Sequence, residues 1–177
     1  ETCGLVTMCR QGDSPDVIAH TSGRAIPNIE VAIMDTEGRI CDPDEPGEIV
    51  VRGYNVMVGY FNNPEATAET IDADGWLHTG DIGTLDAEGN IRITDRLKDM
   101  FISGGFNCYP AEIENQLLQH KHVAQVAIIG MPDERMGEVC AAFVVATANS
   151  EIDDASLIAW SREHMANYKV PRRVIFT

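Results

Sequence analysis

The chain has 177 residues, of which 44% are hydrophobic, so it has room for a sizeable core in one domain or two small ones. Thirteen lysines and arginines against 28 aspartates and glutamates leave a formal net charge of −15. So acidic a chain argues against nucleic acid or an anionic membrane surface as the partner.

Five cysteines form an odd set without a CxxC pair or a regular spacing, so the sequence favours neither a disulfide framework nor a zinc site. Free thiols are typical of the reducing cytoplasm, which is therefore the expected location. No stretch approaches the roughly 18 consecutive apolar residues of a membrane span, so we expect no integral membrane segment. The start of the chain also lacks the charged and apolar segments of a secretory signal.

The first half of the chain predicts a mainly antiparallel β structure. Residues 1–23 have little hydrophobic periodicity and are rich in Gly, Ser and Pro, which predicts a loop. Apolar runs bounded by turn residues predict strands at 30–35, 47–53, 76–86 and 89–95. Asn63-Pro64 begins a short helix that extends through Ile71, because proline suits the first helical position. Together these elements predict a β-barrel-like lobe.

The second half predicts a smaller unit in which helices alternate with strands. A β pair surrounds Gly104, and a loop is expected at Pro132-Asp133. The remaining elements are helices at 110–120 and 153–166 and strands at 123–130, 139–147 and the apolar end of the chain. The order β, α, β, β, α, β is that of a small α+β domain. We therefore expect an incomplete lobe at 1–97, a small mixed α/β domain at 98–177, and an α+β fold class.

The two halves are joined by residues 95–114, which read DRLKDMFISGGFNCYPAEIE. Gly104 and Gly105 stand in the β-like part, where glycine weakens a strand and usually means that a partner approaches the backbone closely. A bulge or a tight hairpin is the alternative explanation. Pro110 and Glu112 then mark the start of a helix.

Residues 76–81, WLHTGD, end in a carboxylate that follows a hydroxyl residue and a glycine. A carboxylate accepts two parallel hydrogen bonds, which suits a vicinal diol such as the 2′,3′-hydroxyls of a ribose. On its own, Asp81 also fits a turn, and Arg96 fits a surface ion pair with Asp95 or Asp99. Since Asp81 ends one strand and Arg96 closes its hairpin partner, we expect both to face one nucleotide.

Three motifs in this order resemble the adenylate-forming superfamily, which includes acyl-CoA synthetases, nonribosomal adenylation domains and luciferases. They are the opening ETCGL, similar to the end of that family's Tyr-Gly-x-Thr-Glu motif, then WLHTGD, and then NIRITDRLKDMFISGGFNCYPAEIE. The resemblance covers essentially the whole chain. It implies the last lobe of a large N-terminal domain followed by a small mobile C-terminal domain.

The resemblance also implies two half-reactions in one site. A carboxylate attacks the α-phosphate of ATP to form an acyl-adenylate and pyrophosphate, and a thiol, usually that of coenzyme A, then displaces AMP. ATP, Mg²⁺ and coenzyme A are the implied cofactors, because the crowded polyphosphate needs counter-charge. The implied substrate is a small-molecule carboxylic acid.

The residue roles implied by the resemblance follow the matching motifs. Glu1 is the acid that helps to hold Mg²⁺, and Lys98 is the hinge about which the small domain turns between the half-reactions. Asp81 binds the ribose hydroxyls, Ile93 packs near the nucleoside, and Arg96 contacts ribose and phosphate. The implied nucleotide- and thiol-binding residues are Thr79, Asp81, Ile93, Arg96, Gly104 and Gly105. The glycine pair leaves room for the pantetheine arm of coenzyme A.

Two parts of the family pattern are missing from this sequence: the Gly- and Ser/Thr-rich phosphate loop, and the catalytic lysine that follows a Leu-Pro-x-x-x-x-Gly-Lys stretch. We therefore expect this polypeptide alone to show no ATP–pyrophosphate exchange. Surfaces that normally pack on the rest of a large domain would be exposed. This predicts homo-oligomers or a strand-exchanged dimer, which light scattering would detect.

The sequence is therefore interpreted as a fragment of an ATP-dependent acid–CoA ligase for a fatty or related acid. Residues 95–114, together with NVMVGYFNNPEAT at 55–67, favour the bacterial branch of such ligases, some of which act on steroid-derived propanoates. Two alternatives stay open: an adenylation domain that loads a carrier protein, and a non-catalytic nucleotide-binding module.

Overall fold

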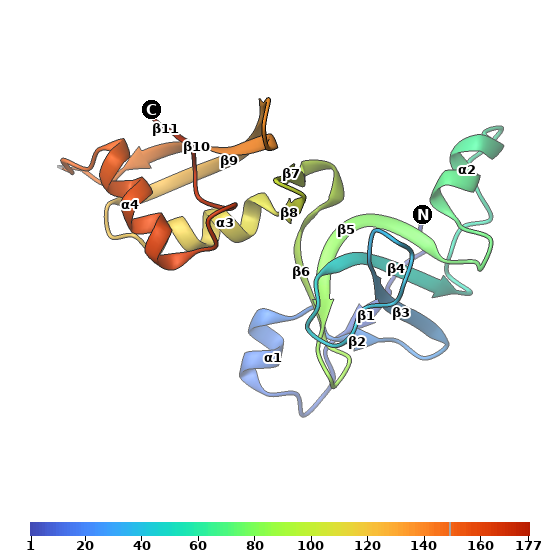
Figure 1. Ribbon diagram of the computed structural model, residues 1–177. Coiled ribbons are helices and arrows are strands. Elements are labelled where there is room, and N and C mark those ends of the chain that lie inside the picture. Colours follow the sequence, from blue (N-terminus) through green and yellow to red (C-terminus); the bar gives the residue numbers. More distant parts are fainter. Residues whose placement is uncertain (149) are drawn as a thin grey trace. The chain divides into compact units, whose positions relative to one another are not determined.

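The computed structural model describes residues 1–148 and 150–177 (Figure 1). The chain separates into two compact units, Glu1–Leu97 and Lys98–Thr177. Each unit has its own sheet and its own cluster of buried apolar side chains. The boundary falls inside a short 3-10 helix, η1 (Leu97–Asp99).

The first unit is built on a four-stranded antiparallel sheet whose strands lie in chain order. They are β3 (Ile29–Met34), β4 (Gly47–Gly53), β5 (Leu77–Leu85) and β6 (Ile91–Arg96). All four predicted strands are confirmed, and β4 has the predicted ends. Ile33, Ile49 and Ile91 form the buried cluster of this sheet.

The sheet of the first unit is open, which corrects the expected barrel-like lobe. Closure requires the first and last strands of a sheet to pair, but in the described part of this unit the pairing ends at β3 and β6. The outer side of β6 is occupied instead by the N-terminal segment. The N–H of Ile91 donates to the carbonyl of Gly23 at 2.9 Å, and the N–H of Ser22 donates to the carbonyl of Ile91 at 2.8 Å.

The N-terminal segment contains structure that the sequence did not predict. A two-residue pair joins β1 (Thr7–Met8) to β2 (Arg24–Ala25). Helix α1 (Pro15–His20) follows Ser14, whose hydroxyl accepts the N–H of Val17 at 3.2 Å. The expectation of a loop was wrong here because α1 buries no residue and so shows no apolar period.

The predicted short helix of the first unit is confirmed as α2 (Pro64–Thr70). The side chain of Asn63 accepts the N–H of Ala66 at 3.1 Å, and Pro64 occupies the first helical turn. Both features favour a helix start at this point.

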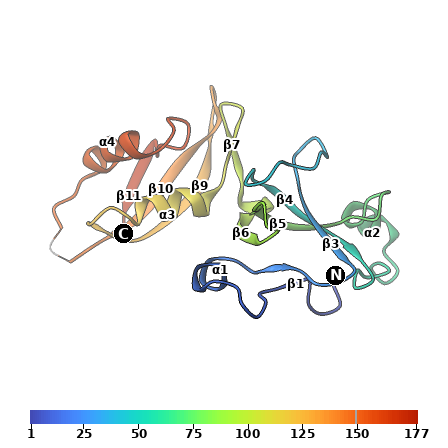
Figure 2. The ribbon, with the colours of Figure 1, turned by 90° about the horizontal axis from the view of Figure 1, so that it is seen from below.

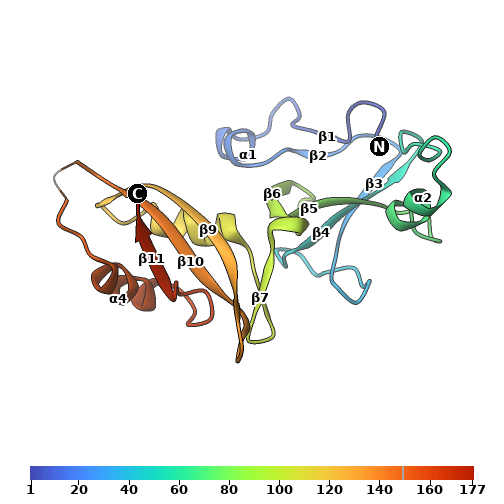
Figure 3. The ribbon, with the colours of Figure 1, turned by 90° about the horizontal axis from the view of Figure 1, so that it is seen from above.

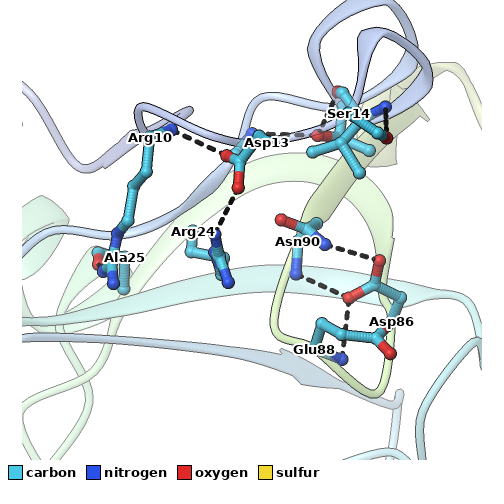
Figure 4. Close-up of polar contacts among 11 residues, drawn as sticks. Arg10, Asp13, Ser14, Arg24, Ala25, Asp86, Glu88 and Asn90 are labelled. Atoms are coloured by element: carbon cyan, nitrogen blue, oxygen red, sulfur yellow. Dashed lines mark hydrogen bonds and ion pairs between the residues drawn. The ribbon is translucent and has the colours of Figure 1, made fainter.

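Figure 4 shows two groups of polar contacts, one in the N-terminal segment and one in the turn between β5 and β6, and a backbone β-bridge pairs Arg24 with Asn90. Asp13 binds the guanidinium of Arg24 at 2.5 Å and the N–H of Arg10 at 2.7 Å. In the turn, Asp86 accepts the backbone N–H and the side-chain amide of Asn90 at 2.7 and 2.8 Å. Burial would raise the pKa of Asp86, but hydrogen bonds, above all those from Asn90, outweigh it and lower that pKa. The bonds accepted by Asp86 therefore stabilise the turn.

The second unit is a five-stranded sheet with two helices, which confirms the α+β class. Its elements are β7 (Phe101–Ser103), β8 (Phe106–Cys108), α3 (Pro110–Leu117), β9 (Val123–Asp133), β10 (Gly137–Ala146), α4 (Asp154–His164) and β11 (Arg173–Phe176). The central strand β10 pairs with β7 and β9 in antiparallel fashion and with β11 in parallel fashion. Strand β8 pairs only with β7 within the described residues.

The expected loop at Pro132-Asp133 is wrong, because β9 continues through both residues. Pro132 is paired with Glu138, and Asp133 with Gly137. A proline lacks the N–H that a ladder uses, but it is tolerated on an edge strand, and within the described residues β9 pairs with β10 alone. The predicted helices are confirmed, although α3 ends at Leu117 and α4 at His164, before their expected limits.

Helices α3 and α4 supply large side chains to the core of the second unit. Ile113 and Leu117 of α3 and Leu157 of α4 are at most 1% exposed. Helix α3 lies along β9 (Figure 2), and α4 lies beside β11 (Figure 3). Among the residues that the structure describes, no helix has the length and apolar character to cross a bilayer.

Two neighbouring leucines test this packing. Leu117 is fully buried, whereas the next residue, Leu118, is 46% exposed. We expect Leu117→Ala to lower the free energy of unfolding by about 2–5 kcal/mol, because it leaves a cavity, and Leu118→Ala to lower it by less than about 1 kcal/mol. Urea unfolding followed by tryptophan fluorescence, to which Trp160 on this core contributes, is the measurement. Equal losses in the two variants would contradict the assigned core.

Candidate functional site

The candidate site lies where β5 leaves the register of β4. Three residues of β5, Thr79–Asp81, lie opposite Ile49 alone. Gly80 has a φ of +72°, a left-handed conformation that favours glycine. A bulge of this kind interrupts the ladder of hydrogen bonds and redirects the side chains next to it. Residues 79–81 are called the Thr79–Asp81 bulge below.

Side chains satisfy the backbone groups that the bulge releases from the ladder. The hydroxyl of Thr79 donates to the carbonyl of Ile49 at 2.7 Å and accepts the N–H of Asp81 at 3.1 Å. The N–H of Gly80 donates to Oε1 of Glu48 at 2.9 Å. Since these polar groups are all partnered, the bulge is a defined conformation and carries Asp81 at a fixed place.

Asp81 and Arg96 are brought together, although Asp81 lies inside β5 and not at the end of a strand as expected. They are paired residues of β5 and β6, and Nε of Arg96 lies 3.8 Å from Oδ1 of Asp81. The side chains are 41% and 65% exposed, so a ligand can reach both. An exposed ion pair of this length contributes only about 0–1 kcal/mol. It orients the two groups without holding them so tightly that a ligand could not take its place.

Ile93 lies on β6, on the same strand as Arg96, and opposite Gly83. Its side chain is 55% exposed, although Ile91 on the same strand is buried. An exposed apolar residue beside exposed charges offers a surface to the flat, partly apolar base of a nucleoside.

Glu1, the expected metal ligand, lies on a different segment of the first unit. The hydroxyl of Tyr60 donates to its carboxylate, and the N–H of Met57 donates to its carbonyl at 2.8 Å. The bond to Glu1 raises the pKa of Tyr60. In the described ranges, no three His, Cys, Asp or Glu side chains gather as a metal site. Tyr60 was not singled out from the sequence, because nothing in its neighbourhood marks a link to residue 1.

Lys98, Gly104 and Gly105 belong to the second unit. Lys98 is exposed in η1, at the boundary between the units. The two glycines form the turn of the β7–β8 hairpin, with φ of +59° and +86°. Tight hairpin turns of this kind need positive φ at both central residues. The structure therefore has the tight hairpin, which was the alternative explanation. The interpretation in which the two glycines stand inside a strand is wrong.

Gly104 is further constrained by its neighbour in the fold. A Cβ atom at this position would lie 2.5 Å from the Cε of Met136, whereas nothing lies within 4 Å of a Cβ at Gly105. The N–H of Gly104 donates to the carbonyl of Met136 at 2.9 Å. The side of Gly105 is therefore the open side of the turn.

Two family models match the chain, one in each half. The family model described as AMP-binding enzyme matches residues 1–61, and the model described as AMP-binding enzyme C-terminal domain matches residues 112–177. A (7a-methyl-1,5-dioxo-octahydro-1H-inden-4-yl)propanoyl:CoA ligase of Rhodococcus jostii is 57% identical over 97% of this chain and 32% of its own length. A long-chain-fatty-acid–CoA ligase of Mycobacterium tuberculosis is 43% identical over 99% of this chain and 34% of its own length.

Solved structures give the same result for the fold. ATP-bound MatB of Rhodopseudomonas palustris matches 89% of this chain with a TM-score of 0.81 and 36% identity, over 32% of its own length. The chain spans about a third of the length of the curated relatives that it matches.

The bulge can be tested through the hydroxyl of Thr79. Thr79→Val removes a donor and an acceptor at nearly constant shape, so we expect the free energy of unfolding to fall by about 1–3 kcal/mol and the N–H of Asp81 to exchange faster with solvent. Thr79→Ser keeps the hydroxyl and is the matched control. Hydrogen exchange measured by NMR and urea unfolding give the two readouts. A Val variant that matches the Ser variant in both would show that the hydroxyl does not hold the bulge.

Proposed function

The chain belongs to the adenylate-forming family of AMP-binding enzymes, and from this premise we propose that it is part of an AMP-forming acid–CoA ligase. In this proposal, Glu1–Leu97 is the last lobe of the large nucleotide-binding domain, and Lys98–Thr177 is the small C-terminal domain. The observation that carries the proposal is the exposed Asp81–Arg96 pair, whose acid stands on a bulge that the protein holds in place. The activity is that of the complete enzyme.

The proposed reaction has two steps. A carboxylate oxygen of the acid attacks the α-phosphorus of ATP, the bond to the β-phosphate oxygen breaks, and pyrophosphate leaves. The sulfur of coenzyme A, having lost its proton, then attacks the acyl carbonyl, and AMP leaves with the electrons of the broken acyl–oxygen bond. Cationic groups near the phosphates lower the barrier of the first step by stabilising negative charge.

In this proposal, Asp81 and Arg96 bind different groups of the same nucleotide. The carboxylate of Asp81 accepts hydrogen bonds from the two ribose hydroxyls, which match its two oxygens. The guanidinium of Arg96 has five N–H donors, and its Nε lies 3.8 Å from Asp81, so the group can also donate to ribose and phosphate oxygens. Thr79 holds the backbone of Asp81, and Ile93 packs against the nucleoside.

Glu1 is the proposed Mg²⁺ ligand. A single carboxylate combined with substrate phosphates and waters is a donor set that Mg²⁺ accepts, so the residues of this chain fit the ion without a cage of several acids. When bound, Mg²⁺ would neutralise charge on the polyphosphate. Tyr60 would orient the carboxylate of Glu1 by donating to it.

The proposed substrate is a carboxylic acid of the fatty or ring-bearing type, and the proposed acceptor is coenzyme A. The names of the relatives support this class: they are CoA ligases for an indenyl propanoate and for long-chain fatty acids, and a feruloyl-CoA synthase of Amycolatopsis is 51% identical over 84% of this chain. Gly104 and Gly105 would give the thiol arm an approach to the backbone on the open side of the hairpin turn.

The ribose role predicts a specific loss in the complete enzyme. We expect Asp81→Ala to lower kcat/KM for ATP by roughly 10- to 150-fold, which corresponds to about 1.5–3 kcal/mol for hydrogen bonds to a charged group. Initial rates of ATP–pyrophosphate exchange at varied ATP concentration measure it. Glu69→Ala, which removes an exposed acid on α2, is the control and should leave this constant unchanged. If Asp81→Ala changes neither KM for ATP nor turnover, the ribose role is wrong.

The hinge role of Lys98 predicts that the two half-reactions respond differently to proline. Lys98→Pro fixes φ at a residue that must change conformation between the steps. We expect ATP–pyrophosphate exchange to persist and thioester formation to fall by at least about tenfold. Lys98→Ala removes the charge but keeps the backbone free, so it should retain more thioester formation than the proline variant. Equal loss of both half-reactions in Lys98→Pro would show that the pivot lies elsewhere.

A further inference from the structure

Glu48 is an unusual residue for its place in the fold. It stands in β4, the strand next to the candidate site, and only 15% of its side chain is exposed. Burying a carboxylate is costly unless each oxygen finds a partner. Both oxygens of Glu48 do: Oε1 accepts the N–H of Gly80 at 2.9 Å, and Oε2 lies 2.7 Å from Nδ1 of His78.

These two contacts bracket Thr79, because His78 and Gly80 are the residues on either side of it. Glu48 thereby fixes the left-handed backbone of Gly80, and the peptide that follows Gly80 carries the N–H of Asp81 to the hydroxyl of Thr79. If Gly80 lost its acceptor, its backbone could rotate, and the side chain of Asp81 would change direction with it.

His78 connects this carboxylate to the preceding turn. Its other ring nitrogen, Nε2, lies 3.7 Å from Oδ2 of Asp72. Asp72 in turn accepts the N–H of Trp76 at 2.8 Å and that of Asp74 at 2.9 Å. His78 thus lies between Asp72 on one side of its ring and Glu48 on the other. Because a carboxylate can only accept, the imidazole directs an N–H at Glu48.

We propose that Glu48 and His78 are positioning residues that hold the Thr79–Asp81 bulge in the conformation with which Asp81 binds ribose. The inference rests on the ribose role proposed for Asp81. Neither residue touches the nucleotide in this account. Their polar atoms are turned toward protein groups, and they act only through the direction in which Asp81 points.

If Glu48 or His78 no longer holds the bulge, the enzyme should lose selectivity for ribose hydroxyls. A general loss of stability would not produce this effect. The selectivity is the ratio of kcat/KM for ATP to kcat/KM for 3′-deoxy-ATP, measured by pyrophosphate exchange in the complete enzyme. In the parent enzyme this ratio is expected to be about tenfold or more, because one hydrogen bond to a charged group is lost with the hydroxyl. In Asp81→Ala it is expected to approach one.

Glu48→Ala should lower this ratio at least about threefold toward the value of Asp81→Ala, because Gly80 loses its acceptor. Glu48→Gln keeps an amide oxygen for the N–H of Gly80 and should retain most of the ratio. Glu30→Ala is the matched control: it removes an acid that pairs with Arg52 in the same sheet, away from the bulge, and should leave the ratio unchanged.

A second pair of variants covers the case in which Glu48→Ala does not fold, which thermal unfolding would reveal. His78→Asn keeps an N–H for Glu48 and should retain the ratio, whereas His78→Phe removes it and should lower the ratio. If folded Glu48→Ala and His78→Phe enzymes keep the ratio of the parent while Asp81→Ala abolishes it, the positioning role is overturned. If Asp81→Ala itself leaves the ratio intact, the proposed ribose role fails first, and the two failures are thereby distinguished.

Discussion

The candidate site depends on the hydrogen bonds that replace the interrupted ladder between β4 and β5. Three residues opposite one leave backbone groups without partners, and a bulge of this size is stable only if side chains supply them. Thr79 and Glu48 do so with one hydroxyl and one carboxylate. The result is an acid, Asp81, that stands exposed beside Arg96. The chemistry proposed for this protein begins from that placement.

The boundary between the two units lies close in the chain to the candidate site. The first unit carries Asp81 and Arg96, and the boundary follows immediately after Leu97. The proposed reaction has two steps that need different groups at one place at different times, and a boundary next to the proposed nucleotide-binding pair is a suitable position for the proposed pivot. The hairpin that contains Gly104 and Gly105 lies near the start of the second unit, and its turn is unobstructed on the side of Gly105.

Sequence patterns predicted those parts of the molecule whose determinants are local. The caps of α2 and the apolar run of β4 sufficed to locate both elements, and the chain order of Asp81 and Arg96 indicated their pairing. The helix α1 was missed because it buries nothing, and the sheet was expected to close because strand patterns do not say what covers an edge. The role of Glu48 arises from a register shift between two strands. That shift exists only in three dimensions, so no spacing in the sequence reveals it.

The central claim is that Asp81 and Arg96 bind the ribose and phosphate of one nucleotide. A crystal structure of the complete enzyme with AMP bound tests it most directly. The account predicts the two carboxylate oxygens of Asp81 within about 3.2 Å of the ribose O2′ and O3′ atoms, with the guanidinium of Arg96 in contact with ribose or phosphate and the bulge unchanged. A nucleotide whose ribose lies away from Asp81 would contradict it.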